Sequence, residues 1–181
     1  MVKSAYSFSN KKEKIENHII VIWVDNEAGV LARVIGLFSG RGYNIDSLAV
    51  AEVDKKQNIS RITIATSGTF QVLQQIKLQL RKLIPVHQVA DFPKNKKTLL
   101  REMALLKVVS TKEKLAKAKK ICKKYKYTIL DSTNKSFVLE VSALKKEIDE
   151  LVKKLQPLGL ASTSRTGVVA MTKGSEIYKQ N

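Results

Sequence analysis

One order of secondary structure occurs twice along this chain, and that repetition constrains the fold more than any other feature. In the first half, short apolar runs bounded by turns are typical of buried strands. Between them, apolar residues recur at helical spacing from Val30 to Phe38 and from Val72 to Leu83. The pattern predicts strands at 18–24, 43–53, 59–66 and 86–91, in the order strand, helix, strand, strand, helix, strand.

The same order returns roughly 80 residues later, which is the signature of an internal repeat. Helical spacing runs from Leu115 to Tyr125 and from Leu144 to Leu155, and strands are predicted at 103–109, 127–131, 136–141 and 166–171. Two tandem copies of this order predict an α+β protein made of two ferredoxin-like βαββαβ domains.

Domain boundaries follow from the repeat and from the polar stretches around it. We expect the first domain at 18–92 and the second at 101–173, with a basic linker at 93–100 and flexible tails at 1–17 and 174–181. Each predicted sheet is small, antiparallel and open at its edges, and open edges invite pairing. We therefore expect a homodimer joined through sheet edges or helices, with two independent monomeric domains as the alternative.

Cysteine usage and the N-terminus limit where the protein works. Cys122 is the single cysteine, which excludes an internal disulfide framework and favours a reducing compartment. No apolar run approaches the roughly 20 residues of a membrane span. The first 17 residues lack an apolar segment and arginine and carry Glu13 and Glu16, so we expect neither a secretory signal nor a transit peptide.

The formal net charge of +17 raises the question of a polyanionic partner. The charge is concentrated in the second half: residues 101–173 carry 17 basic and 7 acidic side chains, against 8 and 6 in residues 18–92. Lysines outnumber arginines 27 to 6, whereas specific phosphate or base recognition relies on the planar arginine fork. We expect solvated or protein-facing surfaces and keep nucleic-acid binding through the second domain as the alternative.

Residues with catalytic chemistry are sparse. His18 and His87 lie in or beside predicted strands, Cys122 lies on an apolar helix face, and no metal-ligand spacing is present. We therefore expect no catalytic residues and no metal site. RNA-recognition domains share the strand order but stack bases on paired aromatics, and the central strands ISRITIAT and KSFVLEVS offer only Phe137.

The segment DNEAGV, at residues 25–30, is the best candidate for a binding site. The first turn of a helix presents free N–H groups and partial positive charge, which together can hold a carboxylate. Gly29 has no side chain to obstruct a ligand, and Asn26 offers both a donor and an acceptor. An ordinary helix cap or turn is an equally good explanation of Asn26 on chemistry alone.

DNEAGVLARVIGLFSGRGYNIDSLAVA, followed by SRITIAT, resembles the ACT domain of the small, regulatory subunits of acetohydroxyacid synthase (acetolactate synthase). The later stretch RTGVVAMTKG, at residues 165–174, is similar to the C-terminal end of that family. The resemblance spans nearly the whole chain after residue 17 and is weakest over the lysine-rich residues 111–157.

The resemblance implies a subunit with no active site and no cofactor of its own. Family members bind a large catalytic subunit that uses thiamine diphosphate, Mg²⁺ and FAD to condense pyruvate with pyruvate or 2-ketobutyrate. They raise its activity and make it sensitive to feedback by valine or a related branched-chain amino acid, leucine or isoleucine. The implied location is the bacterial cytoplasm or the plastid stroma.

The resemblance also places the effector between the ACT domains of a dimer. By motif position, one chain supplies the loop residues and the partner chain supplies two more: Asn26, Ala28, Gly29, Val30 and Leu31, with Asn44 and Ile45 facing them. The effector carboxylate would meet the helix N–H groups, and its branched side chain would meet Val30, Leu31 and Ile45. Such a pocket cannot sharply separate valine from its homologues, because one methylene is worth only about 1–3 kcal/mol.

Overall fold

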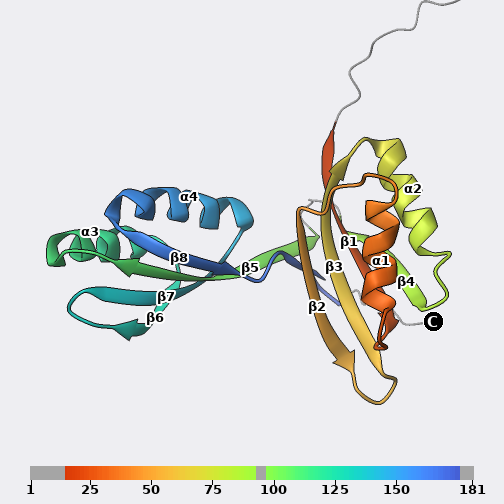
Figure 1. The fold of residues 1–181 in the computed structure, drawn as a ribbon, viewed down its shortest axis with the longest axis horizontal. Coiled ribbons are helices and arrows are strands. Elements are labelled where there is room, and N and C mark those ends of the chain that lie inside the picture. The colour runs from red at the N-terminus through yellow and green to blue at the C-terminus, as the bar shows by residue number, and fades with distance from the viewer. Residues whose placement is uncertain (1–14, 93–96, 176–181) are drawn as a thin grey trace, which may run out of the picture.

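Two lobes, each an antiparallel sheet with two helices on one face, make up the protein (Figure 1). The computed structural model describes residues 15–92 and 97–175. Within them the predicted α+β class and the two ferredoxin-like units are confirmed, since both sheets have the strand order of that fold.

The first lobe contains the elements of the first repeat. They are β1 (Glu16–Asp25), α1 (Val30–Ser39), β2 (Ser47–Asp54), β3 (Ile59–Gly68), α2 (Phe70–Leu80) and β4 (Val86–Phe92). The sheet order is β2-β3-β1-β4, and each neighbouring pair is antiparallel. The predicted strand at 43–53 begins four residues late, because Tyr43 instead packs edge-on against Phe38 at the end of α1.

The central strand β1 is buried on both faces. Side chains of a strand alternate between faces, and Ile20 and Ile22 pack with α1 and α2, while Val21 and Trp23 belong to a separate cluster on the other side. That explains why the sequence HIIVIWV shows a continuous apolar run where a half-exposed strand would alternate. The second cluster is completed by residues from the far end of the chain, Val168 and Ala170.

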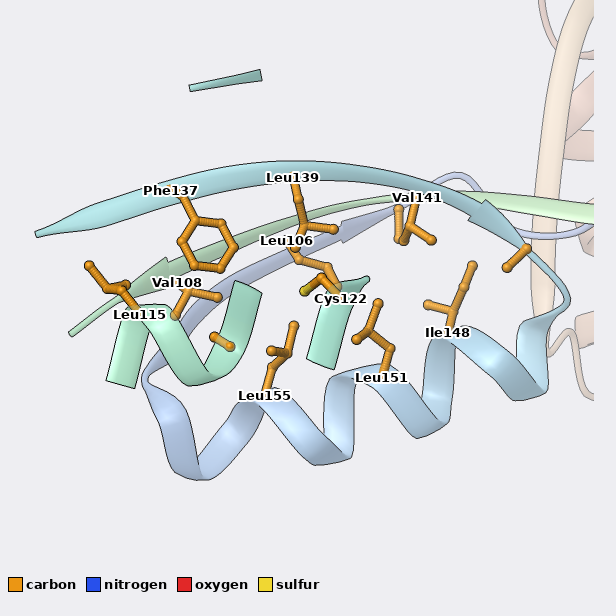
Figure 2. Packing of buried hydrophobic residues seen from close by; sticks show 13 residues of the cluster. Leu106, Val108, Leu115, Cys122, Phe137, Leu139, Val141, Ile148, Leu151 and Leu155 are labelled. Carbon is orange, nitrogen blue, oxygen red and sulfur yellow. The ribbon is translucent and has the colours of Figure 1, made fainter. Parts of the chain in front are cut away.

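The second lobe repeats the arrangement. It contains β5 (Thr98–Val109), α3 (Lys112–Cys122), β6 (Tyr127–Ser132), β7 (Ser136–Ala143), α4 (Lys145–Leu155), a 3-10 turn (Gln156–Leu158) and β8 (Leu160–Arg165), in the sheet order β6-β7-β5-β8. Alternate residues of β5 and β7 face the two helices, and Figure 2 shows Phe137, Leu139 and Val141 directed at Leu151 and Leu155 of α4 and their neighbours. The lysines of α3 and α4 lie outside this core.

The predicted final strand at 166–171 does not close the second sheet, and that expectation was wrong. β8 takes that place beside β5, and the chain then crosses back to the first lobe as β9 (Val169–Thr172), which pairs with Thr98–Arg101 at the start of β5. β8 is almost wholly exposed, so it leaves no hydrophobic signal in the sequence. The apolar signal of β9 comes from burial against the other lobe.

Two predicted boundaries also move. Thr98–Leu100, expected in the linker at 93–100, form the beginning of β5, and Glu16 and Asn17, expected in the N-terminal tail, begin β1. Residues 1–14, 93–96 and 176–181, which hold the rest of the linker and most of both tails, lie outside the described residues.

An ion-pair network marks the point where β5 passes from one lobe to the other. Glu102 is buried and accepts two hydrogen bonds from Arg165, at 2.7 and 2.8 Å, and Arg165 also binds Asp149 of α4 at 2.6 Å. The two carboxylates raise the pKa of the Arg165 guanidinium. Because Arg165 ends β8, this network holds the chain at the start of its return to the first lobe.

Gly159 makes the turn that brings β8 back to β5, and its replacement tests this topology. Its φ is +99°, and a Cβ added there would lie 2.3 Å from the backbone oxygen of Val109. We predict that Gly159→Ala lowers the free energy of unfolding by about 2 kcal/mol or more, through left-handed strain and the clash. The measurement is urea denaturation, with Gly174→Ala as the control, because Gly174 has a similar φ of +77° in open space. Equal stabilities of the two variants would contradict the topology.

Candidate functional site

The loop between β1 and α1 is fastened to the neighbouring strand. The Asn26 N–H donates to the Asn58 carbonyl at 2.7 Å, and Asn58 Nδ2 donates back to the Asn26 carbonyl at 3.3 Å. The side-chain oxygen of Asn26 accepts a hydrogen bond from Ser60 Oγ at 3.0 Å. Asn26 is therefore not the cap of α1, which is Gly29; its side chain ties the loop to β3.

Gly29 opens α1 with bare backbone. It is the N-cap residue, with φ +83°, and no side chain caps the helix there. The first bond back to the cap runs from the Arg33 N–H to the Gly29 carbonyl at 3.0 Å, so the N–H groups of Leu31 and Ala32 precede the hydrogen-bonded ladder. A Cβ at Gly29 would meet nothing within 4 Å. The start of α1 is thus uncapped and accessible.

The apolar part of the predicted site is divided between core and surface. Val30 is buried in the core of the first lobe together with Val34 and Phe38, because these residues share one helix face. Its side chain points into this core, and its backbone borders the loop. Leu31, 37% exposed, lies toward solvent, and so does Ala28.

Asn44 and Ile45 lie at the opposite end of α1. The helix spans 10 residues, roughly 15 Å at 1.5 Å per residue. Asn44 is held there by Thr66 Oγ1, which donates to its carbonyl at 2.6 Å, and Ile45 packs half-buried against the core. Within one chain the structure does not bring the two groups of predicted residues together, so a site containing both requires a second chain.

Ser60 supports the candidate loop, although the sequence pattern did not single it out. It is 5% exposed, and its hydroxyl holds the Asn26 side chain. Its only signal is a small polar residue near the start of the strand ISRITIAT, on the same face as the buried Ile62 and Ile64.

The other candidate residues of the chain are engaged elsewhere. His18 Nδ1 lies 3.1 Å from Asp91 Oδ1, and His87 Nε2 lies 2.6 Å from Asp25 Oδ1. Among residues 15–92 and 97–175, no three metal-ligating side chains form a group. No helix in the described part of the chain is long and apolar enough to cross a bilayer.

A cavity of about 650 Å³ lies between the lobes, at the start of β5 and of α4. It contains none of the seven predicted effector residues. The loop at Asn26–Leu31 is an open surface in a single chain, so a closed pocket there would depend on a second copy of the protein.

Comparison with protein families divides the chain at the same place as its repeat. Residues 20–88 match the model described as the AHAS small subunit-like ACT domain. Residues 101–174 match the model described as the small subunit of acetolactate synthase.

Individual relatives and a solved structure agree with this match. The acetolactate synthase small subunit of Aquifex aeolicus is 34% identical over 171 residues, covering 94% of this chain and 88% of that protein. The isozyme 3 small subunit of Escherichia coli is 33% identical over 162 residues, covering 89% and 98%. The crystal structure of the small subunit from Thermotoga maritima superposes with a TM-score of 0.81 at 28% identity, covering 89% of this chain and 99% of that one.

Cys122 gives a direct test of the expectation that it is a core residue. It is fully buried between α3 and the second sheet (Figure 2), and burial raises the pKa of its thiol to about 11. Because the thiolate is the reactive form, we predict negligible reaction of the folded protein with a thiol reagent at pH 8 and complete reaction in denaturant. Rapid reaction of the native protein would contradict the burial. The raised pKa stabilises the fold fully below pH 9, and this contribution is lost as the pH rises through about 11.

Proposed function

Because the chain belongs to the acetolactate synthase small-subunit family, we propose that it is the regulatory subunit of that enzyme. In this role it binds the large catalytic subunit, raises its activity and makes it sensitive to valine, leucine or isoleucine. Thiamine diphosphate, Mg²⁺ and FAD would be held by the catalytic subunit. The observation that carries the proposal is the uncapped opening of α1 at Gly29, fastened by Asn26 to β3.

The opening suits the carboxylate of an amino acid. The N–H groups of Leu31 and Ala32 and the helix dipole favour a negative group there, and Gly29 leaves space for it. The Asn26–Ser60 hydrogen bond holds the loop before a ligand arrives, which reduces the ordering cost of binding. Leu31 provides an apolar contact for a branched side chain.

The sheet edge at β2 explains how two chains would complete the site. β2 is an edge strand and runs parallel to β1, because both are antiparallel to β3. Its end is level with the effector loop, since Asp54 and Asp25 both pair with Ile59. Its start follows directly after Asn44 and Ile45.

Antiparallel pairing of two β2 edges about a twofold axis places the start of one β2 beside the end of the other. Asn44 and Ile45 of each chain then approach the Asn26–Leu31 loop of the other chain. The separation of these residues within one chain is thus the arrangement that a shared effector site requires. This geometry supports the homodimer and the shared site as one proposal.

Nucleic-acid binding, the alternative considered from composition, finds no support. The matched families are small subunits of a metabolic enzyme.

Co-purification tests the proposed role. The tagged chain, expressed in its own cells, is expected to retain a catalytic-sized partner, and adding the chain to that partner should raise acetolactate formation and permit inhibition by valine. A preparation that instead retains RNA at physiological salt, with no protein partner, would overturn the proposal.

Val50 tests the pairing of β2 edges. It lies near the middle of β2 and is 45% exposed, so a twofold axis there would bring its two copies close together. We predict that Val50→Lys weakens the dimer by about 1–2 kcal/mol, roughly tenfold in Kd, through lost apolar contact and like-charge repulsion. Light scattering across a dilution series measures it. Ile84→Lys is the control, since Ile84 is 96% exposed outside β2, and an equal effect of both variants would contradict this interface.

Gly29 tests the effector site. In Gly29→Asp, the new carboxylate would occupy the ligand's place at the helix opening and repel an incoming carboxylate. We predict that the variant still stimulates acetolactate formation but no longer responds to valine. Its left-handed φ should cost about 1 kcal/mol of stability, because aspartate tolerates that region better than most residues.

The matched control is Gly174→Asp, which adds the same charge at φ +77° in open space, far from α1 in the sequence. It should keep full sensitivity to valine in the reconstituted enzyme. Full sensitivity of Gly29→Asp as well would show that the Asn26–Leu31 loop does not bind the effector.

A further inference from the structure

Arg61 lies on the face of the first sheet that is turned away from α1 and α2. In the strand ladder it stands directly opposite Trp23. Its guanidinium lies over the Trp23 ring, 5.4 Å from the centroid, and 5.9 Å from the centroid of Phe92. Its Nη2 donates a hydrogen bond to the carbonyl oxygen of Ala170. One side chain of β3 thus joins the effector lobe to the C-terminal end of the chain.

The segment that Arg61 holds is residues 167–172, which we call the strap. Val168 and Ala170 of the strap are buried against the first sheet, and the Val168 N–H lies 3.4 Å from Ser47 Oγ at the start of β2. The strap also pairs with the beginning of β5. It begins two residues after Arg165, which binds Glu102 and Asp149 in the second lobe. The strap therefore connects both lobes.

Stability alone does not explain an arginine at this position. Arg61 Nε and Gln88 Oε1 are both buried without a hydrogen-bond partner in the described part of the chain, and both residues stand opposite Trp23. Burying unpaired polar atoms is costly. An apolar side chain of similar length would fill the space without that cost, as happens when buried ionic groups are replaced. What it would lack is the directed hydrogen bond to Ala170 and the contacts of the cation with the Trp23 and Phe92 rings.

Arg61 is also next to the residue that holds the effector loop. Ser60 binds the Asn26 side chain on one face of β3, and Arg61 binds the strap on the other face. A shift of β3 at this end would therefore move both contacts together. Two adjacent residues of β3, Ser60 and Arg61, thus connect the loop with the strap.

We propose that Arg61 is a clamp that holds the strap on the effector lobe and transmits the state of the Asn26–Gly29 loop to the second lobe. The second part rests on the proposed regulatory function, whereas the first part does not. The clamp makes the response depend on contact between the lobes, so a chain with a released strap should bind effector and fail to act on it.

Hydrogen exchange of the full chain tests the clamp without any effector. In Arg61→Met, the amides of residues 167–172 and 98–101 should exchange about ten to a hundred times faster than in the original chain, since a charge-assisted hydrogen bond is lost. Arg61→Lys keeps a cation and a donor and should lie between the two. Arg81→Met is the control, because Arg81 is an exposed residue at the end of α2, and it should change nothing. Unchanged strap exchange in Arg61→Met overturns the clamp; if that variant does not fold, Arg61→Lys decides in its place.

Reconstitution with the catalytic subunit tests transmission. Arg61→Met should bind valine with unchanged affinity by calorimetry, yet show at least a twofold smaller maximal inhibition of acetolactate formation. Full inhibition despite faster strap exchange overturns transmission. If the original chain itself gives no response to valine, the proposed function fails, and the exchange measurement still decides the clamp independently.

Discussion

The burial of β1 on both faces is the constraint on which the rest of the structure depends. Its inner side chains, such as Ile20 and Ile22, are covered by α1 and α2, as in any two-layer fold. Its outer side chains, Val21 and Trp23, need a cover that the first repeat does not contain. The chain supplies it by returning Val168 and Ala170 from its far end. The first lobe therefore covers both faces of β1 only when the end of the chain returns to it.

This dependence distinguishes the two repeats. In the second lobe, Leu105 and Val138 lie on the face turned away from the helices and remain half-exposed, and β5 and β7 alternate between buried and more exposed residues. The central strand of the first sheet is thus covered on both faces, whereas that of the second sheet is covered on one. The first sheet is the one whose loop opens the candidate effector site, so that loop stands on a rigid support.

The candidate site combines a rigid loop with an incomplete pocket. Asn26 is held by Ser60 and Asn58, which fixes the helix opening at Gly29. The residues expected to face it lie at the other end of α1, where Thr66 holds Asn44. Pre-organised backbone on one chain and side chains from another would make effector binding sensitive to how two chains are assembled. Such sensitivity is what coupling between binding and assembly requires.

The local periodicity of apolar residues was enough to predict much of the fold of this protein. The runs and helical spacings of both repeats predicted the α+β class and the order of the elements through α4, and the bare glycine before Val30 predicted the uncapped helix opening. These features depend on residues within a few positions of one another, so the sequence alone predicts them. The continuous apolar run of β1 also indicated burial on both faces. It did not indicate which residues would cover the outer face.

Only the tertiary structure decided what pairs with what. Exposed β8 has no periodic signal, so the sequence predicts the apolar segment of β9 as the closing strand, although its burial comes from the other lobe. Three further features join residues that are far apart in the sequence. They are the burial of the Val30 side chain, the hydrogen bond from Ser60 to Asn26, and the position of Arg61 between Trp23 and Ala170. The physical reason is that the periodicity of apolar residues indicates which side chains are buried. The packing of the whole chain determines which residues cover them.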